Sequence, residues 1–475
     1  YAHKRKLSDI AGIAFRKNST GNSTSNSISV NNVGCKADEI VFTSPRPIKN
    51  MSEIPFCYDT LDDFSNRIIY YESSRGCPFS CSYCLSSVDK TLRFRDTGIV
   101  KRELKFFIDQ KVPQIKFVDR TFNCNHAHAM ELWRFIKAND NGVTNFHFEI
   151  SADLLNQEEL ELISDMRPGL IQLEIGVQST NEVTIKEIHR TMKLERLKEV
   201  VKLIQSGNNI HEHLDLIAGL PYEDYDSFGR SFDEIYELKP NQLQLGFLKV
   251  LKGSFMYDHA KEYGIIYHDR PPYEVLSTKW ISFDDVLRIK KVEEMLEVYY
   301  NSGQFPNTIR HLEKEFCDPF TMYQQLAAFY GQQGWWGQSH SRMQRFEMLR
   351  EFIHSVSENR IYDELLLLDL YLRENSKSRP KWAPDLQNEK KQFLDWFRQE
   401  EQEHQVLKGY EGFSARQMMN MVHLERFSIE TAQLCGWEQQ KEDTQECWVL
   451  FDYRNRNALD QNAGIYFIKS SLASL

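Results

Sequence analysis

Residues 68–84 read IIYYESSRGCPFSCSYC. The apolar run at 68–72 has the length of a β-strand and leads directly into a loop with three cysteines at the spacing CxxxCxxC. Three thiolates on one short loop can face a common point, and thiolate is the soft ligand that zinc, Cu(I) and iron–sulfur clusters prefer. The spacing therefore predicts a metal centre held by Cys77, Cys81 and Cys84.

The number of thiols distinguishes between kinds of metal site. Structural zinc sites are closed by four ligands, and electron-transfer clusters usually have four cysteines. Here the local set stops at three, with no second CxxC and no histidine at ligand spacing beside it. A [4Fe–4S] cluster held by three cysteines keeps one iron open, and an open position is where a metal site binds a substrate or cofactor. The alternative is a structural zinc site completed by a distant Cys or His.

The composition is that of an ordinary globular chain. Of 475 residues, 41% are hydrophobic and 27% charged, which excludes wholesale disorder. Nine cysteines are too sparse, and odd in number, for a disulfide scaffold. With no secretory signal at its start, the chain is predicted to be cytoplasmic. The net charge of −10 argues against non-specific nucleic-acid binding, and no apolar run reaches the length of a membrane span.

Short apolar runs alternate with longer amphipathic ones through the middle of the chain. The strand-like runs are 67–72, 114–119, 145–151, 170–178, 211–219 and 242–249, and the helical stretches are 99–110, 127–138, 157–166, 181–205 and 225–238. Alternating strands and helices form a parallel sheet with right-handed crossovers. Six such units predict an α/β fold with a partial (β/α)6 barrel, whose chemistry lies at the C-terminal ends of the strands. The cysteine loop begins at that edge.

The pattern divides the chain into three parts. Residues 1–65 are expected to form a flexible N-terminal segment and an interdomain strap, because 17–32 is rich in Ser and Asn and 46–63 contains prolines. Residues 66–265 form the barrel. Residues 266–475 form a mainly α-helical C-terminal domain with a few strands. Its helical stretches are 284–300, 341–357, 360–373 and 387–403, and its apolar runs are 447–453 and 464–468.

Several segments in order make the chain resemble the radical SAM superfamily. Besides CxxxCxxC with Tyr83 before its last cysteine, they are 118–123 (VDRTFN), 148–153 (FEISAD), 173–179 (LEIGVQS), 215–223 (DLIAGLPYE) and 248–253 (LKVLKG). The resemblance implies a [4Fe–4S] cluster whose open iron is chelated by S-adenosylmethionine (SAM). It also implies that one electron cleaves SAM to a 5′-deoxyadenosyl radical, so a reductant of the flavodoxin or ferredoxin type is an expected partner.

The resemblance further implies a SAM site at the strand ends. The candidate residues are Tyr83, Asp119, Glu149, Ser151, Glu174, Gln178, Arg190, Gly219, Leu220 and Pro221. Asp119, Glu149 and Gln178 end apolar strands, where burial is costly without a partner such as the ribose hydroxyls or ammonium group of SAM. Arg190 could pair with the SAM carboxylate through its forked guanidinium, and Gly219 allows backbone to approach a flat ring. Each could instead make an ordinary hydrogen bond within the protein.

The segment before the cysteines is most similar to the branch of the superfamily that has an upstream cobalamin-binding domain. In that branch a strap similar to residues 54–63 joins the two domains. This chain starts without such a domain, so we expect either a fragment or a lost domain, and cobalamin is an expected cofactor only if that domain exists.

Three functions stay open: a cobalamin-dependent methyltransferase or related radical catalyst, a cobalamin-independent hydrogen-abstracting oxidase like the oxygen-independent tetrapyrrole enzymes, and a non-catalytic iron–sulfur or zinc protein. Nothing in the sequence specifies the substrate.

Overall fold

A computed structural model describes residues 6–16, 40–58, 60–64, 67–376, 378–437 and 446–468. The chain divides into two compact units, Tyr1–Cys57 and Tyr58–Leu475. In the first unit, β1 (Ala14–Arg16) and β2 (Ile40–Phe42) form an antiparallel pair. The segment 17–32, which the sequence predicts to be flexible, lies outside the described residues.

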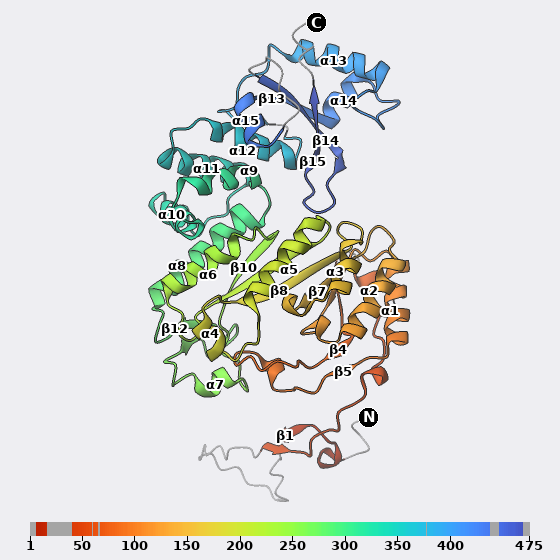
Figure 1. The fold of residues 1–475 in the computed structure, drawn as a ribbon, viewed down its shortest axis with the longest axis vertical. Coiled ribbons are helices and arrows are strands. Elements are labelled where there is room, and N and C mark those ends of the chain that lie inside the picture. Colours follow the sequence, from red (N-terminus) through yellow and green to blue (C-terminus); the bar gives the residue numbers. More distant parts are fainter. Residues whose placement is uncertain are drawn as a thin grey trace, which may run out of the picture. The chain divides into compact units, whose positions relative to one another are not determined.

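Six parallel strands form the main sheet of the second unit (Figure 1). In their order across the sheet they are β10 (Gln242–Phe247), β9 (His211–Ala218), β8 (Ile171–Gln178), β7 (Asn145–Ile150), β6 (Gln114–Phe117) and β3 (Ile69–Tyr71). The order in space follows the order in sequence, so each crossover leads to the adjacent strand, as in a barrel. Because β3 and β10 form the two edges, the barrel is partial, which confirms the predicted (β/α)6 fold.

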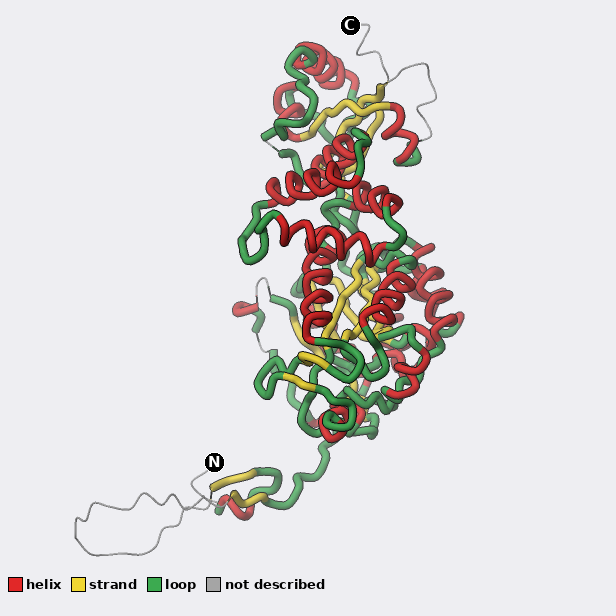
Figure 2. Tube along the Cα trace, turned by 90° about the vertical axis from the view of Figure 1, so that its left-hand side faces the viewer, coloured by secondary structure: helices red, strands yellow, loops and turns green. Residues whose placement is uncertain are grey.

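Helices connect the strands and flank them (Figure 2). They are α1 (Thr97–Asp109), α2 (His126–Ala138), α3 (Gln157–Ser164), α4 (Glu182–Glu187), α5 (Leu194–Gly207) and α6 (Tyr225–Tyr236). Most begin at a side chain that accepts a backbone N–H of the first turn, such as Asp96 before α1 and Asn156 before α3. The sequence predicts one helix over 181–205, which is wrong: α4 and α5 are separated by residues 188–193, where His189 has a left-handed φ of 53°.

Side chains alternate along each strand between two faces of different polarity. Ile115, Phe117 and Phe148 are fully buried, and the ring of Phe148 packs against Trp133 of α2 with centroids 6.0 Å apart. The intervening residues, such as Lys116 of β6 and Glu174 of β8, contact one another instead. Because successive side chains point to opposite faces of a strand, the barrel has an apolar outer face covered by helices and a polar inner face. We call the latter the polar face.

The C-terminal region is mainly helical, as predicted, and ends in a three-stranded antiparallel sheet. Its helices are α8 (Phe283–Leu296), α9 (Pro306–Leu312), α10 (Pro319–Gln332), α11 (Arg342–Val356), α12 (Ile361–Arg373), α13 (Lys390–Glu403), α14 (Ala415–Met421) and α15 (Ile429–Leu434), and its sheet is β13 (Val422–Ser428), β14 (Glu446–Arg456) and β15 (Ala463–Ile468). The sequence analysis missed β13, whose alternation is masked by Glu425. That carboxylate is fully buried and is paired with Arg379 at 2.5 Å.

The part of this region around Asn301 and Phe320 is fixed to the N-terminal end of the barrel, opposite the cysteine loop. The side chain of Asn301 accepts from Leu243 N at 2.9 Å and donates to Leu243 O at 2.8 Å. Phe320 N donates to Asp233 of α6 at 2.7 Å. This part of the C-terminal region therefore supports the barrel at its N-terminal end, whereas Val275 and Trp280 pack at the other end, against Gly219 and Tyr222.

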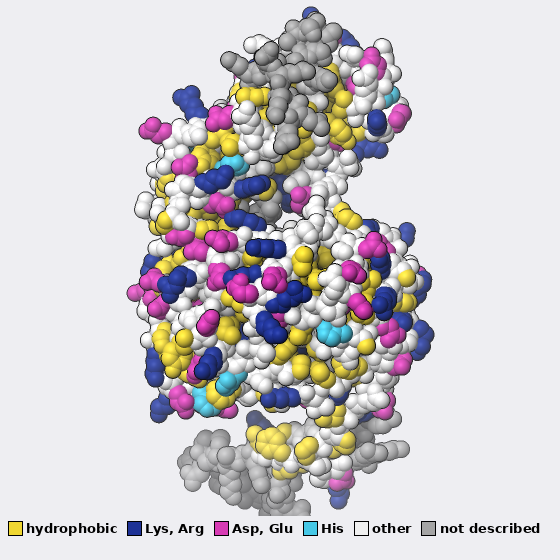
Figure 3. Space-filling view, in the orientation of Figure 1, with side chains coloured by type: hydrophobic (Ala, Val, Ile, Leu, Met, Phe, Trp, Pro, Cys, Tyr) yellow, Lys and Arg dark blue, Asp and Glu magenta, His cyan; other side chains and the backbone are white. Residues whose placement is uncertain are grey.

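The surface of the second unit is charged and mixed. On the face seen in Figure 3, acidic and basic side chains are interspersed. Among the described residues, the helices are either too short or too polar to cross a membrane.

Substitution of Phe148 tests the packing of the sheet against α2. Phe148→Ala removes a fully buried ring from an aromatic cluster. We therefore expect the free energy of unfolding to fall by roughly 3–5 kcal/mol and the thermal midpoint, measured by circular dichroism, to be lower. Val183→Ala, at a site 57% exposed, serves as the control and should leave the midpoint within a degree or so. Equal midpoints for the two variants would contradict this packing.

Candidate active site

The cysteine loop starts after β3 and is closed by a short antiparallel ladder. β4 (Ser74–Arg75) pairs with β5 (Arg93–Phe94), and the chain between them carries all three cysteines. Gly76 follows β4 with a φ of +96°, and a Cβ there would lie 2.5 Å from the carbonyl oxygen of Thr91. A glycine is therefore required at the turn that opens the loop.

Two backbone hydrogen bonds fix the middle of the loop. Ser82 N donates to the carbonyl oxygen of Ile188 at 2.9 Å, and Met256 N donates to the carbonyl oxygen of Ser82 at 2.9 Å. Ile188 follows α4, and Met256 lies in α7 (Phe255–His259), after β10. The loop is thus held by segments that leave the C-terminal ends of β8 and β10, at the edge of the sheet where barrels place their chemistry.

The three thiols are close enough to one another to interact electrostatically. Cys77 and Cys81 are buried and Cys84 is partly exposed. Burial raises the pKa of Cys77, and the Cys84 and Cys81 thiols raise it further. Within the described ranges, no three His, Cys, Asp or Glu side chains are arranged to hold a metal ion. A four-iron cluster takes each thiolate on a different iron, so its ligands need not meet at one point, and a set of three soft donors suits such a cluster.

Arg190 lies beside the loop, in the break between α4 and α5. Its Nη1 is 3.2 Å from the hydroxyl of Tyr83 and 3.9 Å from Cys81 Sγ, and its Nη2 donates to the carbonyl oxygen of Gly176. Arg190 Nε is buried and has no partner among the residues that the structure describes. The break between α4 and α5, which the sequence did not predict, therefore brings the guanidinium of Arg190 to the cysteines. Its Nε is a donor that no described residue uses.

Asp119 has its carboxylate committed within the protein. It is fully buried and accepts from Ser73 N at 2.9 Å, Ser73 Oγ at 2.7 Å and Ser74 Oγ at 2.5 Å. Burial raises the pKa of Asp119 to about 6, although the bonds from Ser74 and Ser73 oppose the rise. His128 Nε2 lies 3.0 Å from Ser73 Oγ. These contacts favour a role in positioning the residues that lead into the cysteine loop over a direct contact with SAM.

Glu149 and Gln178 offer acceptors to a ligand at the polar face. Burial raises the pKa of Glu149 to about 7, and Glu174 and Asp215 act in the same direction while Arg120 opposes it. Gln178 ends β8 at a φ of 79°, next to a shift in register, and its Oε1 is buried without a partner in the described part of the chain. Asp215 faces the same space. Asp215 is not among the residues predicted from the sequence, although its position in the alternation of β9 places it on the polar face.

Other predicted residues already have partners within the protein. Glu174 accepts from Lys116 Nζ at 2.8 Å and lies 2.9 Å from His147 Nε2. Burial alone would raise the pKa of Glu174, but His147 and Lys116 outweigh it and lower the pKa to about 2. Ser151 Oγ donates to Asp153 at 2.8 Å, and Ser151 N donates to Asn123 at 3.0 Å.

The segment after β9 is shaped by packing. Gly219 has a φ of +86°, and a Cβ there would lie 2.7 Å from Val275 Cγ1. Leu220 is fully buried, and the carbonyl oxygen of Pro221 accepts from Thr184 at 3.0 Å. The glycine therefore allows close packing against β12 (Val275–Ser277), and a ligand is not needed to explain it.

Comparison with known families decides the identity of this arrangement. A profile described as the radical SAM superfamily matches residues 71–235, the part of the chain that holds the cysteine loop and the sheet up to α6. The barrel thus matches the radical SAM superfamily over residues 71–235. A second profile, described as a protein of unknown function (DUF4080), matches residues 261–451 of the C-terminal region.

Curated radical SAM relatives are distant and cover part of the chain. The oxygen-independent coproporphyrinogen III oxidase of Pseudomonas aeruginosa is 24% identical over 46% of this chain and 43% of its own. The tRNA-2-methylthio-N(6)-dimethylallyladenosine synthase of Sulfurihydrogenibium is 23% identical over 36% of this chain and 40% of its own. The chain thus spans about two fifths of the length of these relatives.

Solved structures of radical SAM enzymes are also similar. The cobalamin-dependent enzyme OxsB is 14% identical, with a TM-score of 0.48 over 78% of this chain and 60% of that chain. Coproporphyrinogen III oxidase from Escherichia coli is 17% identical, with a TM-score of 0.33 over 47% of this chain and 51% of that chain.

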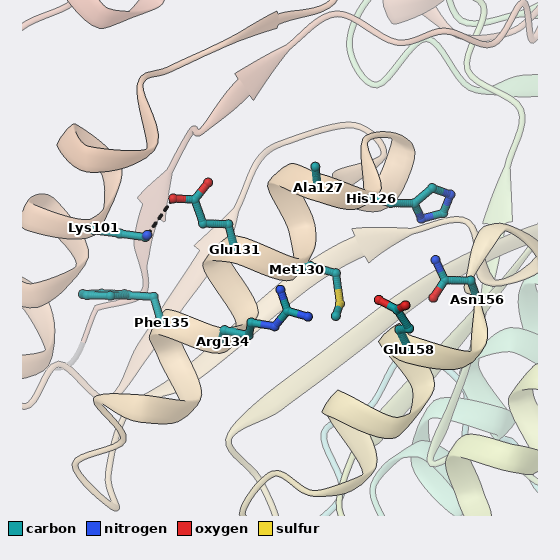
Figure 4. A pocket seen from close by; sticks show the side chains of 9 residues that line it. All are labelled: Lys101, His126, Ala127, Met130, Glu131, Arg134, Phe135, Asn156 and Glu158. Atoms are coloured by element: carbon teal, nitrogen blue, oxygen red, sulfur yellow. Dashed lines mark hydrogen bonds and ion pairs between the residues drawn. The ribbon is translucent and has the colours of Figure 1, made fainter.

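A cavity of about 650 Å³ lies on the outer layer of the radical SAM barrel (Figure 4). Its lining residues come from α1, α2 and the start of α3, and none belongs to the sheet or the cysteine loop. His126, which lines it, lies 2.9 Å from the carboxylate of Glu159. This contact joins the start of α2 to α3.

Asp119→Asn tests the positioning of the cysteine loop. An amide cannot accept on its nitrogen, so at least one buried donor from Ser73 or Ser74 loses its acceptor, at a cost of about 1–3 kcal/mol. We expect less iron bound per chain after anaerobic reconstitution and a lower thermal midpoint. Asp109→Asn, at an exposed ion pair, is the matched control. Iron content and midpoint equal to those of the control would refute the positioning role.

The pKa of Glu149 predicts a pH dependence of SAM binding. The carboxyl ionises at a pH of about 7, and the ionised form is the better partner for an ammonium or hydroxyl group. SAM affinity should therefore rise, by up to roughly tenfold, between pH about 5.5 and about 7.5. Equilibrium dialysis with the oxidised, reconstituted protein measures this. The variant Glu149→Gln has no ionisable group at this position, so its profile of SAM affinity against pH reports the titration of SAM itself. An identical profile for the wild type would exclude a contact between Glu149 and SAM.

Proposed function

We propose that the chain binds a [4Fe–4S] cluster through Cys77, Cys81 and Cys84 and cleaves SAM reductively. The observation that carries this proposal is the placement of three thiols, on one closed loop, at the C-terminal edge of a six-stranded parallel sheet beside Arg190. When bound, such a cluster supplies the electron that splits the sulfonium of SAM and yields a 5′-deoxyadenosyl radical.

Arg190 is proposed to bind the carboxylate of SAM. Its Nε has no partner in the described part of the chain, and its Nη1 is held by Tyr83, so the guanidinium is oriented before a ligand arrives. A guanidinium whose rotamer is fixed loses less entropy when it binds a carboxylate. Tyr83, next to Cys84 in sequence, is proposed to orient Arg190 as well as to lie against the adenine or the cluster.

Glu149, Gln178 and Asp215 are proposed to accept hydrogen bonds from the ammonium and ribose groups of SAM. All three lie near the C-terminal ends of β7, β8 and β9 on the polar face, and Gln178 Oε1 is buried without a partner among the described residues. A buried acceptor without a donor is costly, and a hydroxyl or ammonium group of a ligand removes that cost. Asp119 is proposed to act indirectly, by holding Ser73 and Ser74.

The reaction on the substrate is proposed to be either methyl transfer or hydrogen abstraction. Curated relatives of both kinds match part of the chain, among them a bacteriochlorophyllide d C-12(1)-methyltransferase and an oxygen-independent coproporphyrinogen III oxidase. Methyl transfer with cobalamin is proposed only for a longer product that carries the upstream domain. Cobalamin titration of that product separates the two, because hydrogen abstraction needs no added cobalamin. A flavodoxin or ferredoxin is the proposed electron donor.

SAM cleavage by the reconstituted protein tests the proposal. Wild-type protein given iron, sulfide and dithionite under anaerobic conditions should release 5′-deoxyadenosine, measured by liquid chromatography. Replacement of Cys77, Cys81 and Cys84 by Ala should abolish both the cluster absorbance and the product. Cys317→Ala removes an exposed cysteine of the C-terminal region and should change neither.

Two results would overturn the proposal. Retention of the absorbance by the triple variant would show that other residues bind the iron. Failure of a fully loaded wild-type protein to cleave SAM would return the chain to the non-catalytic iron–sulfur or zinc alternative.

A further inference from the structure

The polar face carries a second set of ionisable side chains, beside the proposed SAM residues, with Glu174 paired in register with Glu149. They are Lys116 of β6, His147 of β7, Glu174 of β8 and both His211 and His213 of β9, and we call them the inner polar cluster. The register of the sheet places them side by side: Lys116 is opposite His147, and Glu174 is opposite His213. Four strands that are far apart in sequence therefore contribute to one cluster.

The cluster is neutralised by short contacts. Lys116 Nζ and His147 Nε2 lie 2.8 Å and 2.9 Å from the carboxylate of Glu174, and His213 Nε2 lies 3.1 Å from Asp215 Oδ1. Each carboxylate thus has a cationic or donor partner. With its charges balanced, the cluster does not select a strongly charged ligand by attraction alone.

The hydrogen-bonding capacity of the cluster exceeds what the protein uses. His211 Nδ1 is buried and has no partner within the described ranges. The side chains of Lys116 and Glu174 keep 24% and 19% of their surface exposed, so both remain accessible to solvent. Buried and half-buried polar groups with free capacity are costly unless a ligand or water satisfies them.

A packed interior would have a different composition. Parallel sheets are usually covered on both faces, and their strands read as continuous apolar runs. Here the outer face follows that rule, whereas the inner face carries a lysine, a glutamate and three histidines. A stability role alone does not explain this, because apolar side chains would serve it at lower desolvation cost.

We propose that the inner polar cluster binds the substrate, and that the substrate is a small polyhydroxylated compound of the sugar or nucleoside type. A hydroxyl both donates and accepts, so it can satisfy the carboxylate of Glu174 and the imidazoles of His147, His211 and His213 in turn. An apolar substrate would leave the unused hydrogen-bonding capacity of the cluster, such as His211 Nδ1, unsatisfied, and sites built to bind hydroxyls reject such compounds strongly.

The proposal rests on the proposed function, because the cluster and the SAM residues share one face. Glu149 and Asp215 lie two residues beyond His147 and His213 along their strands, or about 7 Å nearer the cysteine loop. A compound anchored on the cluster therefore extends toward the position proposed for SAM.

Ligand-observed NMR on the full chain tests the proposal. The protein is reconstituted, left oxidised so that SAM is not cleaved, and saturated with SAM so that the SAM residues are occupied. Saturation transfer is measured to methyl β-D-glucopyranoside, to uridine and to coproporphyrin III. We expect transfer to at least one hydroxylated probe, and Glu174→Gln combined with His213→Gln should weaken its Kd roughly tenfold or more.

The matched control is Glu234→Gln, which breaks a comparable ion pair with Lys198 between α5 and α6 and should leave Kd unchanged. If the double variant has a lower thermal midpoint than the wild type, or has lost the absorbance of the iron–sulfur cluster, the single variant His211→Gln is used in its place. The His211 side chain contacts neither carboxylate closely. Transfer to neither hydroxylated probe, transfer to coproporphyrin III only, or equal affinity in wild type and variant would overturn the proposal. Protein that binds a hydroxylated probe but never cleaves SAM would refute the proposed function instead, so the two failures are distinguishable.

Discussion

Alternation of side chains along six parallel strands is the constraint on which the rest of this structure depends. Because the strands are parallel and adjacent in sequence order, their C-terminal ends meet at one edge and their odd and even positions fall on two continuous faces. The apolar positions bury Phe117, Phe148 and their neighbours under the helices. The polar positions accumulate on the inner face, where they have no helix to cover them and must be satisfied by one another or by a ligand.

The cysteine loop depends on contacts that lie outside it. Ser73 and Ser74 precede the loop and are held by the buried carboxylate of Asp119, which ends the neighbouring strand. The middle of the loop is held by backbone bonds to Ile188 and Met256. Such a loop is fixed before a cofactor binds, which lowers the entropic cost of binding it. The cost is the burial of an acid whose pKa is raised.

The C-terminal region contacts the barrel at both ends, with Val275 packed on Gly219 at the end that carries the cysteine loop. Asn301 completes the hydrogen bonds of Leu243 at the start of β10, and Phe320 packs on Gly229 of α6, where a Cβ would approach its ring to 2.8 Å. The strands whose C-terminal ends carry the candidate site are thereby braced at their N-terminal ends. The matched region of unknown function is therefore continuous with the barrel in its packing.

The sequence by itself determined the number and order of the strands of the main sheet, the three thiols and the edge of the sheet where they lie. Those features are local: strand length, alternation and cysteine spacing are properties of short segments. Only the tertiary structure decided the rest. Arg190 reaches Cys81 because a predicted helix breaks at His189, and the commitment of Asp119 to Ser73 and of Glu174 to Lys116 depends on the register between strands. Register and side-chain partners follow from contacts between segments far apart in sequence, and no local pattern carries that information.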